Sequence, residues 1–279
     1  MNANQTRLVA LDLDGTLLDS SKRLSARNLR ALERAAAAGI EIVPTTGRFF
    51  GGMPQEVRDL PFVRYAITVN GAQVFDRAEG AVLSRAEMDA GTAVSVMETL
   101  DGFDAIYDCY QDDWGWMTES MQAKAGLYAP DAHYLKMIRE LRRPVPDLKA
   151  RLAARGAGVQ KVMCFARDPA DLPAIRAAVS ARHPTLALTQ STPNNVEIND
   201  ALANKGEALR RLASALGFGA AGCMAFGDGL NDLSMVRAAG TGVAMANACP
   251  EVLAAADVVT LSNDDDGVAA VLEKIVPAP

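Results

Sequence analysis

Asp12 and Asp14 follow the first apolar run of the chain, residues 8–11, and are separated by one leucine. Alternate residues of an extended segment share a face, so these carboxylates would converge, and their charges repel unless a cation lies beside them. Oxygen ligands of this kind favour Mg²⁺. Because Asp14-Gly15 is also a common turn dipeptide, a plain turn at the end of a buried strand is the alternative interpretation.

Three more groups of polar residues follow apolar runs or open a helical segment. These groups are Thr46, Lys205, and Asp228 with Asn231 and Asp232. The carboxyl ends of parallel strands meet at one edge of an open sheet, where ligands bind, so we expect all the groups to share one crevice. Their chemistry suits phosphoryl transfer, because a carboxylate can attack phosphorus while Mg²⁺ neutralises the phosphoryl oxygens.

Short apolar runs alternate with amphipathic segments on both sides of the middle of the chain. The expected strands are residues 8–11, 40–43, 65–69, 195–198, 223–226, 243–245 and 258–261. The expected helices are residues 26–38, 53–60, 206–216, 233–239, 250–256 and 267–276. This alternation predicts an α/β fold with a doubly wound parallel sheet. A hairpin is expected around the turn-rich residues 77–80.

The middle of the chain has a different rhythm and composition. Both tryptophans and most tyrosines fall between residues 107 and 134. The strands expected here, at 103–110, 114–118, 159–166 and 186–191, do not alternate regularly with the helices expected at 145–154 and 169–181. We therefore expect an inserted α+β domain at residues 85–190, with residues 1–84 and 191–279 forming the core.

The composition limits the kinds of partner and metal site that can be expected. With 279 residues and a formal net charge of −6, the chain is not expected to bind nucleic acid. Neither a signal peptide nor a membrane-spanning stretch is expected, which indicates a cytoplasmic protein. The four cysteines have no zinc spacing, so free buried thiols are expected, and the two histidines are too few for a histidine-rich metal site.

The sequence resembles phosphatases of the haloacid dehalogenase superfamily, and among them the Cof-type hydrolases. The resemblance is carried by residues 12–18 (DLDGTLL), 46–48 (TGR), 70–72 (NGA), 205–206 (KG), 227–232 (GDGLND), 242–248 (GVAMANA) and 266–269 (DGVA). It implies a Rossmann-like core with an inserted α/β cap. It also implies a Mg²⁺-dependent phosphatase that acts on a small phosphorylated metabolite, a sugar phosphate or a phosphorylated cofactor, through an aspartyl phosphate.

The resemblance further implies roles for the aspartates. Asp12 would attack phosphorus, and Asp14 would protonate the leaving alcohol and then activate water. Asp12, the backbone carbonyl of Asp14, and Asp228 would coordinate Mg²⁺. Asp232 would orient Lys205 or a metal-bound water.

The phosphate-binding residues implied by the resemblance are Thr46, Gly47, Lys205 and Asn231. Lys205 would hold the negative charges of Asp12 and of the phosphate together. Arg48, which follows Gly47, fits either a structural hydrogen bond or a contact with the substrate.

Substrate choice is expected to lie in the inserted domain, because the core reads only the phosphate. The candidates to meet a sugar or a flat cofactor ring are Tyr107, Tyr110, Trp114 and Trp116. Packing within the small core of the inserted domain is an equal alternative for each of these aromatic residues.

Two other functions use the same types of residue. A phosphomutase of the same superfamily would use the same nucleophile but return the phosphoryl group to its sugar. A non-catalytic phosphoacceptor module would also combine Asp, Thr, Lys and Mg²⁺ on a doubly wound sheet, but this chain is far longer than a receiver domain, and Asp14 adds a group for turnover. The sequence leaves the oligomeric state open.

Overall fold

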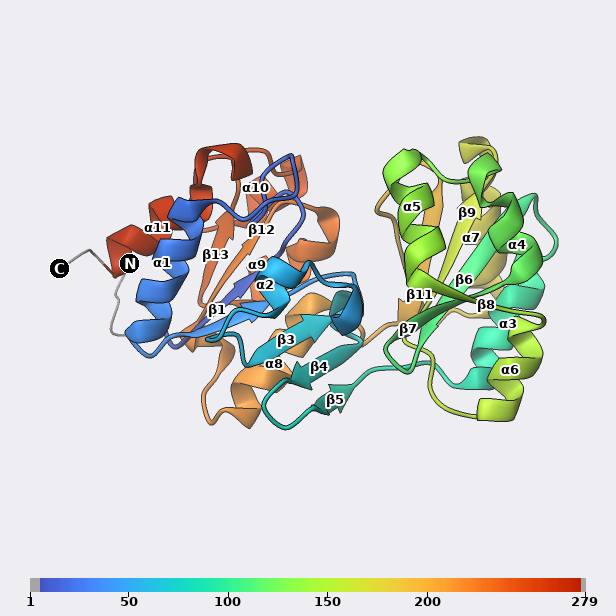
Figure 1. Cartoon of the computed structure of the whole chain (residues 1–279), viewed down its shortest axis with the longest axis horizontal. Coiled ribbons are helices and arrows are strands. Elements are labelled where there is room, and N and C mark those ends of the chain that lie inside the picture. The colour runs from blue at the N-terminus through green and yellow to red at the C-terminus, as the bar shows by residue number, and fades with distance from the viewer. Residues whose placement is uncertain (1–5, 277–279) are drawn as a thin grey trace. The chain divides into compact units, whose positions relative to one another are not determined.

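The computed structural model describes residues 6–276, apart from the side chain of His133. The chain forms two units, which we term the core unit (Met1–Arg85 with Asn204–Pro279) and the cap unit (Ala86–Ala203). Each unit has its own sheet and its own helices (Figure 1). The predicted fold class, a parallel-sheet core with an inserted α+β domain, is confirmed.

A five-stranded parallel sheet forms the centre of the core unit, in the order β14-β13-β12-β1-β2. Its strands are β1 (Leu8–Leu11), β2 (Glu41–Pro44), β12 (Cys223–Gly227), β13 (Thr241–Ala244) and β14 (Val258–Val259). Side chains of β1 enter apolar clusters on opposite faces of the sheet, Val9 and Leu11 on one face and Leu8 and Ala10 on the other. A strand that is buried on both faces reads as a continuous apolar run, which explains why the sequence predicts it well.

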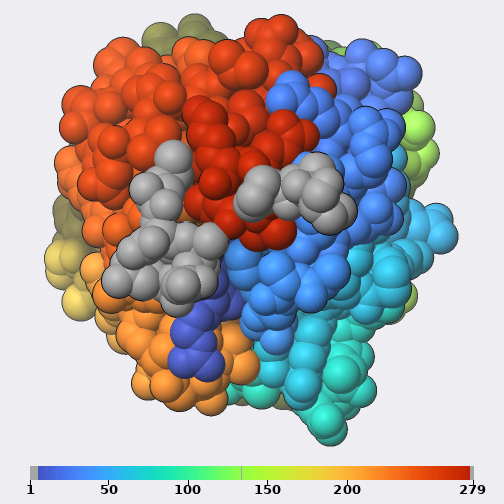
Figure 2. Space-filling view, turned by 90° about the vertical axis from the view of Figure 1, so that its left-hand side faces the viewer, coloured from blue at the N-terminus to red at the C-terminus, as the bar shows by residue number. Residues whose placement is uncertain are grey.

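Helices cover both faces of this sheet. The helices α1 (Ala26–Ala37) and α11 (Gly267–Ile275) pack on the face that carries Val9 and Leu11, and Figure 2 shows them side by side, in blue and red. The helices α8 (Lys205–Ala215) and α9 (Leu233–Ala238) pack on the opposite face. The core unit also contains the short helices α2 (Gln55–Arg58) and α10 (Pro250–Ala255).

The strand β3 (Tyr65–Thr68) departs from the expected parallel sheet. It joins that sheet through a single bridge, between Thr45 and Ile67, and pairs along its length with β4 (Gln73–Asp76). Next to β4 lies β5 (Ala81–Arg85), which completes a three-stranded antiparallel sheet and the predicted hairpin. The bridge to the core sheet is parallel, as expected, but it is a single one, and the other edge of β3 pairs antiparallel with β4 after the turn at residues 69–71.

The cap unit is built on a six-stranded sheet in the order β10-β11-β9-β6-β7-β8, antiparallel except between β7 and β8. Its strands are β6 (Ala105–Gln111), β7 (Trp114–Thr118), β8 (Arg142–Val145), β9 (Lys161–Ala166), β10 (Leu186–Thr189) and β11 (Asn195–Asp200). The helices α3 (Ala90–Leu100), α6 (Leu148–Arg155) and α7 (Leu172–Arg182) bury one face of the sheet. The helices α4 (Glu119–Lys124) and α5 (Ala132–Leu141) pack against part of the other face.

The second boundary of the cap unit differs from the one expected at residue 190. The strand β11 pairs with β9 and β10 inside the cap sheet, so the unit ends at Ala203. The sequence pattern identifies β11 as a strand but does not say which sheet receives it. The helix α3 is not assigned from the sequence, since several of its residues are threonine, valine and serine, which have low helix propensity.

All four cysteines are free thiols, as expected. Cys109, Cys164 and Cys223 are buried, whereas Cys249 is partly exposed. Within the described part of the chain, every helix is too short or too polar to cross a lipid bilayer.

Candidate active site

Three aspartates meet where the two central strands of the core sheet end. Since β1 and β12 are hydrogen-bonded neighbours, Asp12 and Asp228 leave the sheet at the same edge, and the Asp12 N–H donates to the carbonyl of Phe226 at 3.1 Å. One carboxylate oxygen from each of Asp12, Asp228 and Asp232 lies within 4.8 Å of the other two. The side chain of Asp14 is not part of this group.

Lys205 supplies the positive charge of the acidic group. Its side chain is fully buried, and its Nζ donates to Oδ1 of Asp12 and to Oδ1 of Asp232, both at 2.5 Å. The lysine opens α8, whose first turn is capped by the side chain of Asn204, an acceptor for the Glu207 N–H at 2.9 Å. Because a buried ammonium is stable only with paired charges and satisfied hydrogen bonds, the two aspartates hold Lys205 in place.

Burial and mutual repulsion shift the pKa values of these groups. Burial, and then the charge of Asp232, raises the pKa of Asp12 well above its ordinary value, although Lys205 opposes the shift. The same two causes raise the pKa of Asp228 to about 6. Burial acts to lower the pKa of Lys205, but Asp12 and Asp232 outweigh it, and the net shift is upward.

The donor set fits Mg²⁺. Three carboxylates beside one ammonium leave an excess of negative charge. The pKa values of Asp12 and Asp228 are raised because keeping this charge buried is energetically unfavourable. A divalent cation beside the carboxylates would remove this cost. Mg²⁺ prefers oxygen ligands of this type.

Asp14 contacts two cations instead. The Arg48 guanidinium donates to it through Nη2 at 2.9 Å and Nε at 3.2 Å, and Nζ of Lys22 lies 3.0 Å from its Oδ1. Burial acts to raise the pKa of Asp14, but the charges of Arg48 and Lys22 outweigh it and hold the pKa below its ordinary value. The side chain is 34% exposed, so it has room to move. Arg48 thus makes a hydrogen bond within the protein, and its contact with the substrate stays a prediction.

Gly15 and Thr16 bring the end of β1 close to Asp228. Gly15 has a left-handed φ of +92°, and a Cβ at this position would lie 2.5 Å from Oδ2 of Asp228. The Thr16 hydroxyl donates to Oδ1 of Asp228 at 2.7 Å, and Asn247 donates to the Gly15 carbonyl at 2.8 Å. Both conformation and space therefore require glycine at position 15. Thr16 was not predicted as a site residue.

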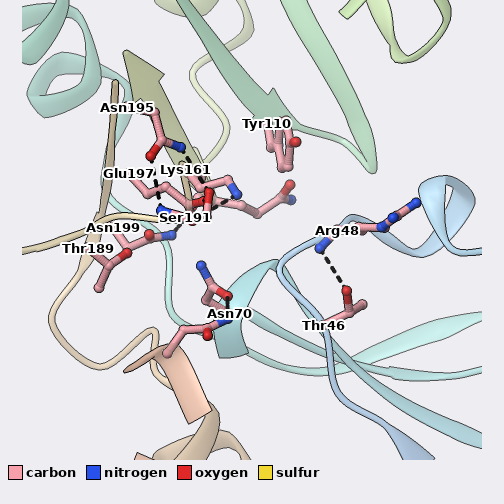
Figure 3. Close-up of polar contacts among 12 residues, drawn as sticks. Thr46, Arg48, Asn70, Tyr110, Lys161, Thr189, Ser191, Asn195, Glu197 and Asn199 are labelled. Carbon is pink, nitrogen blue, oxygen red and sulfur yellow. Dashed lines mark hydrogen bonds and ion pairs between the residues drawn. The ribbon is translucent and has the colours of Figure 1, made fainter. Parts of the chain in front are cut away.

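Thr46 follows β2, the other neighbour of β1. The preceding Thr45 N–H donates to the Leu11 carbonyl at 2.7 Å, which fixes this strand end beside that of β1. Thr46 is buried, and its hydroxyl accepts a hydrogen bond from the Arg48 N–H at 3.2 Å (Figure 3). That oxygen retains its own proton for a ligand.

Asn70 connects two of the predicted phosphate-binding residues. Its Oδ1 accepts from Nδ2 of Asn231 at 3.3 Å, and a Cβ at Gly47 would lie 2.9 Å from the same atom. Asn70 has a left-handed φ of 55°, in the turn after β3. The Asn70-Gly71 dipeptide at a strand end is the signal that could have identified it, whereas the contact of Lys22 with Asp14 leaves no mark in the sequence.

The aromatic residues predicted for the cap divide between two faces of its sheet. The pairing of β6 with β7 places Tyr107, Trp114 and Trp116 on the face that α3, α6 and α7 cover. The guanidinium of Arg151 stacks on the ring of Trp116 at 3.5 Å. Tyr107 and Trp116 pack in the apolar cluster beneath these helices, whereas the ring of Trp114 is contacted by the guanidinium of Arg143. Tyr110 lies on the opposite face.

An open parallel sheet with acidic strand ends, a buried lysine and an inserted α+β unit defines a class of α/β enzymes. The chain belongs to the haloacid dehalogenase-like hydrolases, because the model of this family matches residues 9–272. The predicted membership of this superfamily is thereby confirmed.

Known proteins of similar sequence are phosphatases. The chain is 30% identical to phosphatase YwpJ of Bacillus subtilis, over 97% of this chain and 100% of that protein. It is 32% identical to the pyridoxal phosphate phosphatase YbhA of Escherichia coli, over 95% of this chain and 96% of that protein. A solved haloacid dehalogenase-like hydrolase from B. subtilis, 29% identical, matches with a TM-score of 0.81 over 96% of this chain and 99% of that chain. The prediction of an enzyme of the phosphatase class is confirmed by these relationships.

Proposed function

We propose that this protein is a Mg²⁺-dependent phosphomonoester hydrolase that acts on a small phosphorylated metabolite through an aspartyl phosphate. The observation that carries the proposal is the buried Lys205, bound to Asp12 and Asp232 beside Asp228. Relatives with named substrates, YbhA and the 5-amino-6-(5-phospho-D-ribitylamino)uracil phosphatase YwtE of B. subtilis, act on phosphorylated metabolites. The substrate would be a sugar phosphate or a phosphorylated cofactor.

In the first half of the reaction, Asp12 attacks the phosphorus of the ester. Lys205 donates to Oδ1 of Asp12, which leaves Oδ2 for the new bond to phosphorus. The bond between phosphorus and the ester oxygen breaks. Asp14, which takes up a proton from solvent when its side chain leaves Arg48 and Lys22, gives that proton to the ester oxygen. The alcohol leaves, and the phosphoryl group remains on Asp12 as an acyl phosphate.

In the second half, water releases the phosphate. Asp14, now a carboxylate, removes a proton from a water molecule whose oxygen attacks the phosphorus. The bond between phosphorus and Asp12 breaks, which restores the Asp12 carboxylate and the protonated Asp14. Because Arg48 and Lys22 hold Asp14 in the present structure, its side chain must leave part of this ion pair to reach the reacting oxygen.

Asp12, Asp228 and the backbone carbonyl of Asp14 would hold the Mg²⁺. When bound, the ion supplies positive charge that shields the phosphoryl oxygens from the attacking carboxylate. Asp232 accepts from Lys205 and also from the N–H groups of Asp228 and Gly229, at 3.0 and 2.9 Å, and is therefore a positioning residue.

Four groups are proposed to bind the phosphoryl oxygens: the side chains of Lys205, Thr46 and Asn231, and the N–H of Gly47. Each offers a hydrogen-bond donor, and donors aimed at developing negative charge contribute most to phosphoryl transfer. Lys205 has a donor beyond the two that Asp12 and Asp232 accept.

Release of phosphate from p-nitrophenyl phosphate tests the proposal. We expect steady turnover with Mg²⁺, loss of activity with EDTA and restoration by excess Mg²⁺. A phosphorylated protein that does not turn over would indicate a phosphoacceptor module. Conversion of a sugar 1-phosphate to its 6-phosphate without phosphate release would indicate a phosphomutase.

A further inference from the structure

The turn that follows β3 has a strained backbone. Val69, Asn70 and Gly71 all have a left-handed φ, at 50°, 55° and 97°. Glycine and asparagine adopt this conformation at little cost, but a β-branched residue such as valine does not. Strained conformations persist only where neighbouring segments enforce them, and they cluster at functional sites. The contacts of this turn include three segments that each carry a proposed phosphate-binding group.

The first of these segments is the loop that follows β2. The Asn70 N–H donates to the Thr46 carbonyl at 3.0 Å, and the Val69 N–H donates to the Arg48 carbonyl at 2.9 Å. Figure 3 shows Thr46, Arg48 and Asn70 on these adjacent segments of the core unit. The two carbonyls flank Gly47, whose N–H is a proposed phosphate ligand. The turn therefore fixes the backbone that carries the Thr46 hydroxyl and the Gly47 N–H.

The second segment follows β12 and contributes Asn231. Nδ2 of Asn231 donates to Oδ1 of Asn70 at 3.3 Å. A side-chain amide nitrogen carries two hydrogens, so one can bind Asn70 while the other remains for a phosphoryl oxygen. Asn70 is buried and held through its backbone N–H, whereas Asn231 is partly exposed. The fixed residue of this pair therefore orients the more exposed one.

The third segment is the start of α8, which carries Lys205. Nη2 of Arg211, on the same helix, donates to the Gly71 carbonyl at 2.8 Å. A Cβ at Gly71 would lie 2.4 Å from the carbonyl oxygen of Asn204 and 3.1 Å from Cβ of Ala208. Glycine is required here both by its left-handed φ and by this close approach. The first two turns of α8 are thereby held against the turn after β3.

The three segments are far apart in the chain, and the turn is a feature that contacts all of them. A phosphoryl group is stabilised in the transition state only when its donors are already aimed at the developing charge. Donors that come from separate segments need a common support to keep their spacing. The turn at residues 69–71 supplies such a support, although it contributes no group to the proposed mechanism.

We propose that the turn at residues 69–71 is the positioning element of the phosphate site, in which Asn70 aims the amide of Asn231 and Arg211 holds the turn against the helix that carries Lys205. The inference rests on the proposed phosphatase function and extends it to two residues that act through others. Asn70 and Arg211 are positioning residues, because their contacts are with the groups that bind phosphate or with the segments that carry them.

Asn70→Gly tests the side chain of Asn70, because glycine keeps the left-handed φ and removes only the amide. Asn231 contacts phosphate in the bound ester and in the transition state alike, so KM should rise more than kcat falls. We expect KM for p-nitrophenyl phosphate and the inhibition constant of inorganic phosphate to rise about tenfold, with kcat reduced less than about threefold. The matched control is Asp112→Gly, at an exposed cap position whose φ is also left-handed, at 56°. It should leave all three constants unchanged.

A double-mutant cycle distinguishes positioning from a general loss of structure. If Asn70 acts through Asn231, Asn70→Gly adds nothing once Asn231→Ala has removed the amide. We expect each single variant and the double variant to lose about tenfold in kcat/KM. Two losses that multiply, to about a hundredfold in the double variant, would show that the residues act independently and would overturn the inference.

Arg211→Met tests the contact between the turn and α8. It should raise the inhibition constant of inorganic phosphate by about fivefold, because the Gly71 carbonyl loses its charged donor. Arg211→Lys keeps a donor and should give a smaller rise, and it replaces Arg211→Met if that variant does not fold. The control is Arg210→Met, since the neighbouring Arg210 forms an exposed pair with Glu207. Equal inhibition constants in the Arg211 and Arg210 variants would overturn the role of Arg211.

The outcomes separate the two proposals. A wild-type protein that releases no phosphate from p-nitrophenyl phosphate overturns the proposed function, and this inference with it. Wild-type turnover together with an Asn70→Gly variant of unchanged KM and phosphate inhibition overturns the inference alone. So does a cycle in which Asn231→Ala has no effect of its own.

Discussion

The core and cap units both bury charged side chains against a β-sheet, but at different places on the sheet. In the core unit, Asp12 meets Lys205 beyond the carboxyl end of a parallel strand. In the cap unit, Lys161 meets Glu197 on the face of an antiparallel sheet. Backbone topology therefore places the core group, whereas the alternation of side chains along strands places the cap group.

This difference suggests a division of labour. Strand ends of a parallel sheet hold reacting groups at one edge whatever the residues on the sheet faces are. A sheet face can change one residue at a time without moving the backbone, which suits selection among substrates. Loss of a core group should then affect all substrates alike, whereas loss of a cap group should change their ranking.

The largest effect is expected for Asp12→Asn. The amide has nearly the same shape but is a far weaker nucleophile, so kcat should fall at least about a thousandfold on every phosphate ester. Phosphate release under saturating substrate measures this, and circular dichroism confirms that the variant is folded. If the variant retained wild-type turnover, Asp12 would not be the nucleophile. The assignment of the chemistry to the core unit would then fail as well.

Lys205→Met should produce the next largest effect. It leaves Asp12 and Asp232 buried without the ammonium that both bind, which should lower the free energy of unfolding by about 3 kcal/mol. Activity should fall about a hundredfold on all substrates, because a donor to the phosphoryl group is lost.

Urea unfolding measures the stability of this variant. The matched control is Lys149→Met in the cap, whose ion pair with Asp101 is partly exposed and should contribute less than about 1 kcal/mol. Equal stability of the two lysine variants would contradict the account of the buried core group.

The sequence predicted the charged group of the core unit but not that of the cap unit, because the first lies at strand ends and the second on a sheet face. The pairing of Asp12 with Lys205 could be expected because apolar runs mark buried parallel strands and the motifs mark their ends. The Lys161–Glu197 pair could not, since the two residues lie far apart in sequence and meet only through the pairing of β9 with β11. The same pairing moved β11 from the expected core to the cap.

The aromatic residues of the cap show a second limit. Tyr107 and Tyr110 are three residues apart on β6, so they point to opposite faces. The sequence contains this alternation, but it does not reveal which face the helices cover. Only the positions of α3, α6 and α7 place Tyr107 in packed structure.

A change in the pH profile is expected for Arg48→Met. Arg48 helps to hold the pKa of Asp14 below its ordinary value, so its removal raises that pKa. Asp14 then stays protonated, and able to donate to the leaving group, to higher pH. The alkaline limb of kcat/KM should therefore move to higher pH.

The control for this profile is Arg58→Met, because Arg58 pairs with the exposed Asp59 rather than with Asp14. Its profile should match that of the wild type. An alkaline limb that stays in place in Arg48→Met would argue against Asp14 as the acid.

The smallest effect is expected for Tyr107→Phe. Its hydroxyl donates to Oδ1 of Asp101 at 2.8 Å on the helix-covered side of the cap sheet. Loss of this bond should lower the free energy of unfolding by about 1 kcal/mol and leave the ranking of substrates unchanged. Urea unfolding and kcat/KM ratios check both statements, and a changed ranking would return Tyr107 to the substrate-binding residues.

The central claim is that Asp12 carries the phosphoryl group during turnover. Borohydride reduces an acyl phosphate of aspartate to homoserine, which peptide mass spectrometry can locate. When the enzyme is quenched during turnover of p-nitrophenyl phosphate and then treated with borohydride, we expect homoserine at position 12 and none at position 14. Continued phosphate release with no modification at position 12, or with the modification at another aspartate, would contradict the account.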